Sequence, residues 1–281
     1  MEFVVVILLT AAFGVCTSMF LGLSSVVFQY FDDRVQLLKP LKPAYRRFLN
    51  NNFSYYANLD PYRKRDFEKR LKYFLFHKQF VARNMRTVTE EMKLMIGACA
   101  VQLTFGFRPL KLAHFSKIVL YPKEYYSVRN RRRHKHKGQV NSNGMIVFSW
   151  EDFLKGYKIG DDGYNLGLHE MAHALRLEDA IINEEYAFIE VKDLHHWNRV
   201  ASREFYKIKM GEPSFLRTYA GTNMEEFFAV CVEQFFEQPE DFSQELPQLY
   251  EATCAMLRQD PLSGMVYNDT AIYEDKSEKS V

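Results

Sequence analysis

The chain opens on an uninterrupted apolar stretch. Between Phe3 and Phe31 there is no charged residue, about 29 positions in a row, whereas roughly 18 already indicate a bilayer-spanning helix. A cleaved secretory signal would have a basic start and a shorter apolar core, but this chain begins Met-Glu and stays apolar beyond Val27. We therefore expect residues 1–31 to form a transmembrane anchor.

Behind the anchor the spacing of apolar positions becomes helical. Residues 32–60 contain two early prolines and a run of asparagines, which predict a juxtamembrane segment. One helix is predicted from Tyr62 to about His77 and a second from Val88 to Leu103, opening at Thr87 or Thr89. These long periodic segments predict that helices dominate the fold.

Strands are predicted only in the middle of the chain. Short apolar runs at residues 117–121 and 144–148 read as two strands that would form a hairpin but for a charged insertion between them. A single helix is expected over residues 239–259, and residues 263–281 are polar enough to form a disordered tail. The sequence thus predicts a mostly helical α+β domain over residues 61–262.

Charge and cysteine content indicate on which side of the membrane this domain lies and argue against some classes of protein. Positive residues stay on the cytoplasmic side of a membrane, and they follow the apolar stretch while none precedes it. They are Arg34, Lys39, Lys42, Arg46 and Arg47. The three cysteines beyond the anchor have no paired spacing, which argues against a disulfide framework or a cysteine zinc site. The net charge of +2 gives no overall field that would attract nucleic acid. We expect a single-pass inner-membrane protein with a cytoplasmic domain.

The strongest chemical signal is the pattern HExxH at residues 169–173, inside an apolar, helix-compatible run. Residues four apart share a helix face, so His169 and His173 can both reach one Zn²⁺ ion, and Glu170 lies beside them. Zinc bound by two imidazoles and one further ligand activates water, with the glutamate as general base. The alternative is a pair of core histidines with satisfied hydrogen bonds. Buried histidines and a glutamate without partners would be unfavourable, which favours the metal.

A third ligand is expected from the segment that follows Tyr219. Thr222 with Glu225, or Asn223 with Glu226, matches a helix capping box. Glu226 and Glu233 are seven apart on one apolar face, so both are candidates for a buried carboxylate that needs a cation. For Glu225 a capping or solvated role is the alternative to ligation. Periodicity alone does not choose between these residues.

Three blocks of the chain resemble the Mlc titration factor A family of zinc-dependent peptidases, whose catalytic domain is similar to that of anthrax lethal factor. They are residues 138–150, the HExxH block and residues 219–239. The resemblance implies a zincin-like metallopeptidase domain and makes Glu226 the third zinc ligand. It also implies that the hydroxyl of Tyr219 donates to the oxyanion of the transition state; otherwise Tyr219 would read as one more packed aromatic residue.

The chain departs from the family pattern just after the second histidine. Arg176 stands where an acid is usual, which puts the support of the ligand histidines in doubt. Asp179 could orient a ligand imidazole, because metal-bound histidine usually donates its other N–H to a carboxylate or carbonyl. The alternative for Asp179 is a solvated charge near the helix end.

Two further segments bear on partners. Residues 129–137 are strongly basic and are expected to form a solvated loop, either without a role or in contact with anionic lipid or RNA. His134 and His136 lie in this loop among many cations, which argues against metal binding by them. Residues 144–149 are predicted to be the edge strand that receives an extended peptide substrate.

The sequence supports three functional readings. The first is a membrane-anchored peptidase that hydrolyses peptide amides, with Glu170 and Tyr219 as catalytic residues and zinc held by His169, His173 and Glu226. The second is a regulator that sequesters a cytoplasmic protein such as a transcriptional repressor. The third is a zinc hydrolase of a non-peptide amide or ester.

Overall fold

The computed structural model describes residues 39–129, 132–181 and 188–267. The chain divides into residues 1–41, of which 39–41 are described, and a compact unit of residues 42–281 that carries all the elements below. The predicted anchor therefore lies outside the described residues, as do residues 268–281 of the predicted tail. Within the described ranges, no helix combines the length and apolar character needed to cross a bilayer.

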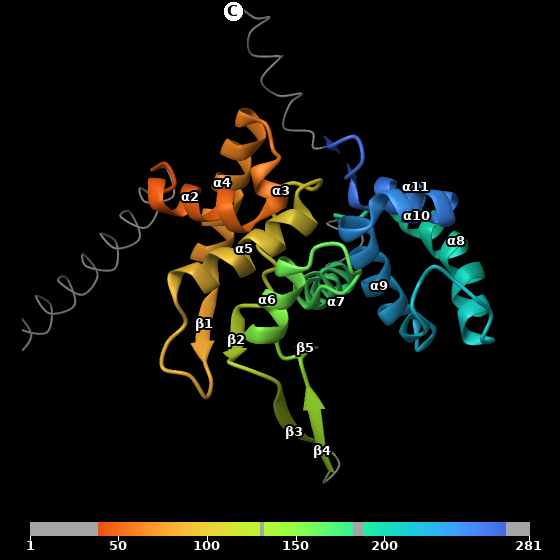
Figure 1. The fold of residues 1–281 in the computed structure, drawn as a ribbon, viewed down its shortest axis with the longest axis horizontal. Coiled ribbons are helices and arrows are strands. Elements are labelled where there is room, and N and C mark those ends of the chain that lie inside the picture. The colour runs from red at the N-terminus through yellow and green to blue at the C-terminus, as the bar shows by residue number, and fades with distance from the viewer. Residues whose placement is uncertain (1–38, 130–131, 182–187, 268–281) are drawn as a thin grey trace, which may run out of the picture. The chain divides into compact units, whose positions relative to one another are not determined.

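The compact unit contains a four-stranded mixed sheet with strand order β1-β2-β6-β5 (Figure 1). The strands β1 (Gln79–Ala82), β2 (Lys117–Tyr121) and β6 (Met145–Ser149) run parallel, and β5 (Gly138–Asn141) runs antiparallel to β6 at the edge. The apolar runs of β2 and β6 are buried, as expected for parallel strands covered by helices.

The predicted hairpin between residues 117–121 and 144–148 is wrong. These strands are adjacent but parallel, with Ile118 opposite Ile146, so the chain has to cross back between them. The predicted solvated loop is also wrong, because part of the crossover is a two-stranded hairpin of β3 (Tyr125–Arg129) and β4 (Arg132–His136). Residues 130–131 at its tip lie outside the described residues.

Helices make up most of the remaining chain and confirm the mostly helical α+β prediction (Figure 1). The elements not yet named are α2 (Pro43–Asn52), α3 (Ser54–Ala57), α4 (Pro61–Phe76), α5 (Glu90–Thr104), α6 (Trp150–Lys158), α7 (Leu166–Ile181), α8 (Val191–Lys209), the 3-10 helix η2 (Thr218–Gly221), α9 (Met224–Glu237), α10 (Pro239–Glu245), α11 (Pro247–Leu257), β7 (Gln259–Asp260) and β8 (Met265–Val266).

Local capping explains where the predicted helices begin. The Asp60 side chain accepts hydrogen bonds from the amides of Tyr62 and Arg63, and Pro61 occupies the first turn of α4. The Thr89 hydroxyl caps α5 by accepting from the Met92 amide at 3.3 Å, which settles the choice between the two threonines. Both predicted helices are therefore confirmed to within a few residues.

Two predicted boundaries differ in the structure. The single helix expected over residues 239–259 is two helices, because Pro247 has no amide hydrogen to continue the first and instead opens α11. Residues 43–57, within the predicted juxtamembrane segment, form α2 and α3 and bury Leu49, Phe53 and Tyr56.

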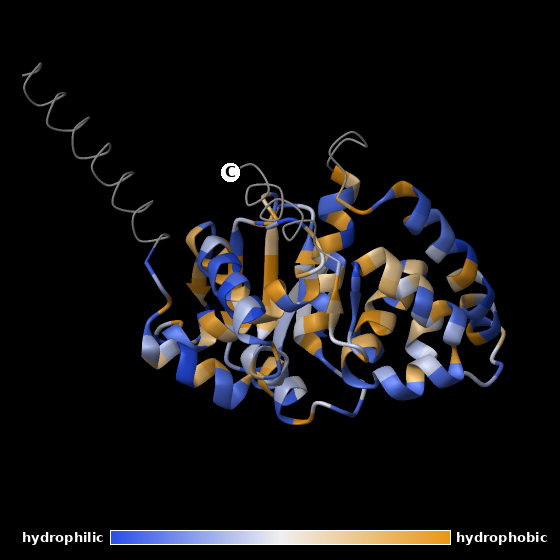
Figure 2. Ribbon diagram, turned by 90° about the horizontal axis from the view of Figure 1, so that it is seen from above, coloured by the Kyte–Doolittle hydropathy of each residue, from blue (hydrophilic) through white to orange (hydrophobic). Residues whose placement is uncertain are grey.

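Helix α7 is the central helix of the fold. It packs against α5, α6 and α9 and also contacts β5 and β6. Ten of its residues are buried, including both His169 and Glu170. Figure 2 shows polar residues concentrated on the outer helices, whereas the strands and inner helices carry more apolar positions. Polar side chains on α7 therefore need partners within the protein or from a bound ligand.

Candidate metal centre

The start of α7 is fixed by an asparagine that caps it. Asn165 Oδ1 accepts from the Leu168 amide at 3.0 Å, and its Nδ2 donates to the Gly156 carbonyl at 3.2 Å. Two residues after Asn165, a Cβ on Gly167 would fall 2.6 Å from the Phe153 ring, so α7 lies directly against α6. The HExxH residues that follow therefore lie on a helix whose start is fixed by capping and by packing against α6.

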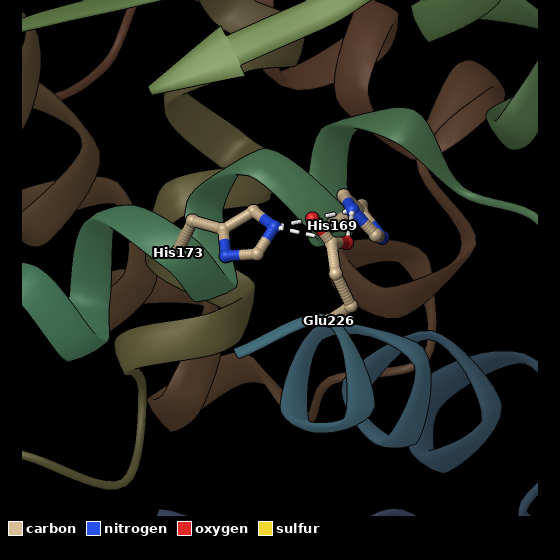
Figure 3. A group of neighbouring side chains, drawn as sticks. All are labelled: His169, His173 and Glu226. Carbon is tan, nitrogen blue, oxygen red and sulfur yellow. Dashed lines mark hydrogen bonds and ion pairs between the residues drawn. The ribbon is translucent and has the colours of Figure 1, made fainter. Parts of the chain in front are cut away.

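His169, His173 and Glu226 converge on one point (Figure 3). The two Nε2 atoms are 3.2 Å apart, and Glu226 Oε2 lies 3.0 Å from His169 Nε2 and 3.4 Å from His173 Nε2. In a tetrahedral zinc site with ligand distances of about 2.0–2.1 Å, neighbouring ligand atoms lie about 3.3 Å apart. The three donors thus have the spacing that a zinc ion requires.

The carboxylate oxygen at this point faces both imidazoles. Glu226 Oε2 is buried and lies within ion-pair distance of both imidazoles. Burial alone would raise the pKa of Glu226, yet the neighbouring imidazoles hold this pKa well below its usual range. A half-buried carboxylate kept ionised between two imidazoles fits a metal ligand. Within the described ranges this is the one group of three such side chains close enough to share an ion.

Glu233 occupies a different place from Glu226 although both lie on α9. Its Oε1 accepts from His169 Nδ1 at 2.7 Å and from Arg217 Nη2 at 2.5 Å, and its Oε2 accepts from the Asn165 amide at 2.7 Å. The Glu233 carboxylate binds Nδ1 on one edge of the His169 ring, so that Nε2 on the opposite edge points toward Glu226. Burial alone would lower the pKa of His169. The carboxylates of Glu226 and Glu233 outweigh the effect of burial and raise this pKa to about 10.

Glu170 is 6 % exposed and lies between the two histidines on α7. Burial raises the pKa of Glu170 to about 7, against the opposing effect of the two imidazoles. A Cβ on Gly138 would fall 2.4 Å from Glu170 Oε1, so the backbone of β5 lies directly over this carboxylate. Glu170 is thus held in a narrow space with a pKa suited to proton transfer near neutral pH.

Tyr219 stands at the rim of the centre. It is 49 % exposed, and its ring lies 6.1 Å from the His169 ring. Burial of its hydroxyl, assisted by the nearby Glu226 carboxylate, raises the pKa of Tyr219 to about 12. Tyr219 therefore keeps its proton at neutral pH and can donate it in a hydrogen bond.

The residues near the end of α7 do not support the ligands. Asp179 Oδ1 accepts from the Ile189 amide at 3.3 Å, and the Arg176 guanidinium lies 5.6 Å from the centre of the Phe228 ring. The suggested role of Asp179 in orienting an imidazole is therefore wrong, and Glu233 occupies that role. The helix cap is Asn223, which accepts from the Glu226 amide at 2.9 Å, and Glu225 is exposed.

Two cavities of about 670 and 640 Å³ flank the centre and share five residues. The shared residues are His136, Gly138, His169, Glu170 and Tyr219. The predicted edge strand at residues 144–149 is wrong, because β6 is paired on both sides and β5 is the edge next to α7. A peptide could add to that edge through backbone hydrogen bonds.

Several site residues escaped the sequence analysis. Arg217 donates to Glu233 and to the Gly163 carbonyl at 2.8 Å, but no motif distinguishes it from other arginines. Asn165 precedes the helix as an N-cap residue, a signal that could have been read. Gly138 lay within a block of the family resemblance but had no assigned role.

Comparisons with known proteins connect this chain with metallopeptidases. A family described as "Glucose-regulated metallo-peptidase M90" matches residues 29–258. An uncharacterized protein of Synechocystis sp., slr2042, is 26% identical over 229 residues, which cover 76% of this chain and 82% of that protein. Proteins named Mlc titration factor A are 28% identical in Salmonella agona, covering 52% of this chain and 60% of that protein, and 27% identical in Escherichia coli, covering 62% and 72%.

Proposed function

This chain belongs to the glucose-regulated metallo-peptidase M90 family, and from that premise we propose that it is a zinc-dependent peptidase with His169, His173 and Glu226 as metal ligands. The observation that carries the proposal is the spacing of the three donor atoms, which lie 3.0–3.4 Å from one another and include the buried Oε2 of Glu226. When bound, zinc would supply Lewis-acid activation of a water molecule and of the substrate carbonyl.

The protein groups supply the proton transfers and the orientation. Glu170 accepts the proton of the attacking water and returns it to the amide nitrogen as the C–N bond breaks, for which a pKa of about 7 is suitable. The Tyr219 hydroxyl donates to the carbonyl oxygen as negative charge develops there. Glu233 fixes the orientation of the His169 ring through Nδ1. Peptide amides are the substrate class, supported by the family and by the free edge of β5.

Metal analysis combined with two variants tests this function. The wild type is expected to hold one zinc per chain, and His169→Ala should hold much less. Glu170→Gln should keep its zinc while peptide hydrolysis falls by about 100-fold or more. Full turnover by Glu170→Gln would refute the assignment of the base, and zinc retained by His169→Ala would refute the ligand set.

The second candidate is a regulator that binds a cytoplasmic protein. It is favoured by the name of the relatives, Mlc titration factor A, which points to a protein partner of those relatives. A zinc-loaded protein that cleaves nothing in a broad peptide library, yet captures one partner equally well after Glu170→Gln, would favour this candidate over the peptidase.

The location of the domain is part of the proposal. The apolar residues 1–31 and the basic residues after them support a single-pass anchor in the inner membrane with the peptidase domain in the cytoplasm. A carboxyl-terminal reporter that is active only in the cytoplasm should be active, and removal of residues 1–31 should release the protein from the membrane fraction.

A further inference from the structure

The two cavities beside the metal centre share a region that is lined in part by His136, a histidine of strand β4. Three of their five shared residues, His169, Glu170 and Tyr219, already have proposed roles. The other two, His136 and Gly138, come from the strand side of the site, at the end of β4 and the start of β5. His136 therefore faces the same space as the proposed catalytic groups, although it is more than thirty positions away from them in the chain.

The position of His136 is fixed by an aromatic stack. Its ring lies against the Tyr125 ring at 5.8 Å and 27°, and Tyr125 in turn stacks on Tyr121 at 4.4 Å and 12°. Tyr125 is 8 % exposed and is the partner of His136 in the β3–β4 register. The base of the hairpin thus carries His136 on a buried aromatic stack.

The chain after His136 is also held in place. The Lys137 carbonyl accepts from the Ser149 amide at 2.6 Å, which ties this residue to the end of β6. Gly138 then passes directly over Glu170, where a Cβ would fall 2.4 Å from Oε1. His136 is two positions before Gly138, so its backbone is held near Glu170.

A substrate that fills both cavities must pass through the region they share. That region is lined by Glu170, by Tyr219 on the helix side and by His136 on the strand side, so a reacting carbonyl placed there would have all three within its surroundings. An imidazole carries at least one N–H in either protonation state, so it can donate to a carbonyl oxygen whose negative charge grows in the transition state.

The geometry points to His136 as a further catalytic residue that donates an imidazole N–H to the oxygen of the reacting carbonyl. This inference rests on the proposed peptidase function. It adds a second donor to Tyr219 and gives the base of the β3–β4 hairpin a role in the reaction.

Kinetics of three variants test the inference. His136→Leu should lower kcat by about 100-fold and leave KM within about threefold, because the contact strengthens in the transition state. His136→Gln keeps an N–H donor and should recover at least about tenfold of that loss. His195→Leu, on the exposed surface of α8 and outside both cavities, is the matched control and should behave as wild type. All variants should bind equal amounts of zinc. A kcat for His136→Leu within twofold of wild type, or a loss confined to KM, would overturn the inference.

A binding experiment separates this inference from the proposed function. A peptide hydroxamate, which joins an extended peptide to a zinc-binding group, is titrated into the zinc-loaded proteins. His136→Leu should weaken its Kd about tenfold, and the ring ¹⁵N resonances of His136 but not of His195 should shift on binding. Equal affinities and an unshifted His136 ring would overturn the role of His136 even in an active enzyme. A wild type that cleaves no peptide would refute the peptidase, whatever this titration gives.

Discussion

Glu233 provides the most informative test of the metal centre, because it acts on the metal only through another residue. Its side chain is 3 % exposed and receives hydrogen bonds from His169 Nδ1, Arg217 and the Asn165 amide. In Glu233→Gln the size is unchanged, but the charge is lost and an NH₂ group replaces one acceptor oxygen. At least one of the three donors must then face another donor.

The expected effect follows from the contact with His169. Loss of a partner behind a ligand histidine typically weakens metal binding 10- to 100-fold, which corresponds to about 1.4–2.7 kcal/mol. The lower end applies if the carbonyl oxygen of the new side-chain amide still accepts from Nδ1, with the NH₂ group facing the backbone N–H of Asn165. The upper end applies if the NH₂ group faces the imidazole and rotates the ring away from Glu226.

Zinc affinity is measured by competition with a chromophoric chelator, after circular dichroism has established that each protein is folded. Glu225→Gln is the matched control, since Glu225 is exposed on the same helix and should bind zinc as wild type does. Glu226→Gln should lose far more affinity than Glu233→Gln, because it removes a ligand. If Glu233→Gln binds zinc within twofold of wild type, the orientation of the His169 ring does not depend on Glu233.

Three further predictions concern neighbouring groups. Gly138→Ala should displace the Glu170 carboxylate and lower kcat at least tenfold with zinc content unchanged, as steady-state kinetics and metal analysis will establish. Tyr219→Phe should lower kcat about 100-fold with little change in KM; an equal loss in ground-state inhibitor binding would contradict the donor role. Burial raises the pKa of Glu237 from 4.5 to about 7 against the hydrogen bond from Asn165, so the folded state binds this proton more tightly than the unfolded state. That contribution to stability is present below pH 4.5 and is lost as the pH rises through 7. Urea unfolding should therefore find Glu237→Gln more stable than the wild type at pH 8, by about 3 kcal/mol at most. At pH 4 the two proteins should have similar stability.

Local signals predicted the helices well and the strand pairing poorly. The start of α4 at Asp60-Pro61 and of α5 at Thr89 depends on contacts within one turn of the chain, which sequence patterns record. The pairing of β2 with β6 depends on residues more than twenty positions apart, and buried strands read alike whether they run parallel or antiparallel. The β3–β4 hairpin was missed because its charged sequence has no apolar alternation.

The residues of the proposed metal centre divide in the same way. His169 and His173 were identified from one helical turn, whereas the contribution of Arg217 and the cover of Glu170 by Gly138 arise only when distant elements pack together. His136 illustrates the limit most clearly. In the sequence it lies among cations in a predicted loop, and only the parallel crossover brings it to the cavities beside Glu170.

The two glutamates on α9 explain why periodicity alone left the third ligand open. Positions seven apart return to the same helix face, and their Cα atoms are separated by about 10 Å along the axis. In the structure both carboxylates reach the same imidazole, Glu226 beside Nε2 and Glu233 at Nδ1 of His169. A ring with two nitrogens on opposite edges needs one partner on each side if one nitrogen is to face a metal. The spacing therefore predicted correctly that both carboxylates lie on one face of α9, and the direction in which α9 passes α7 decides which of them lies beside both histidines.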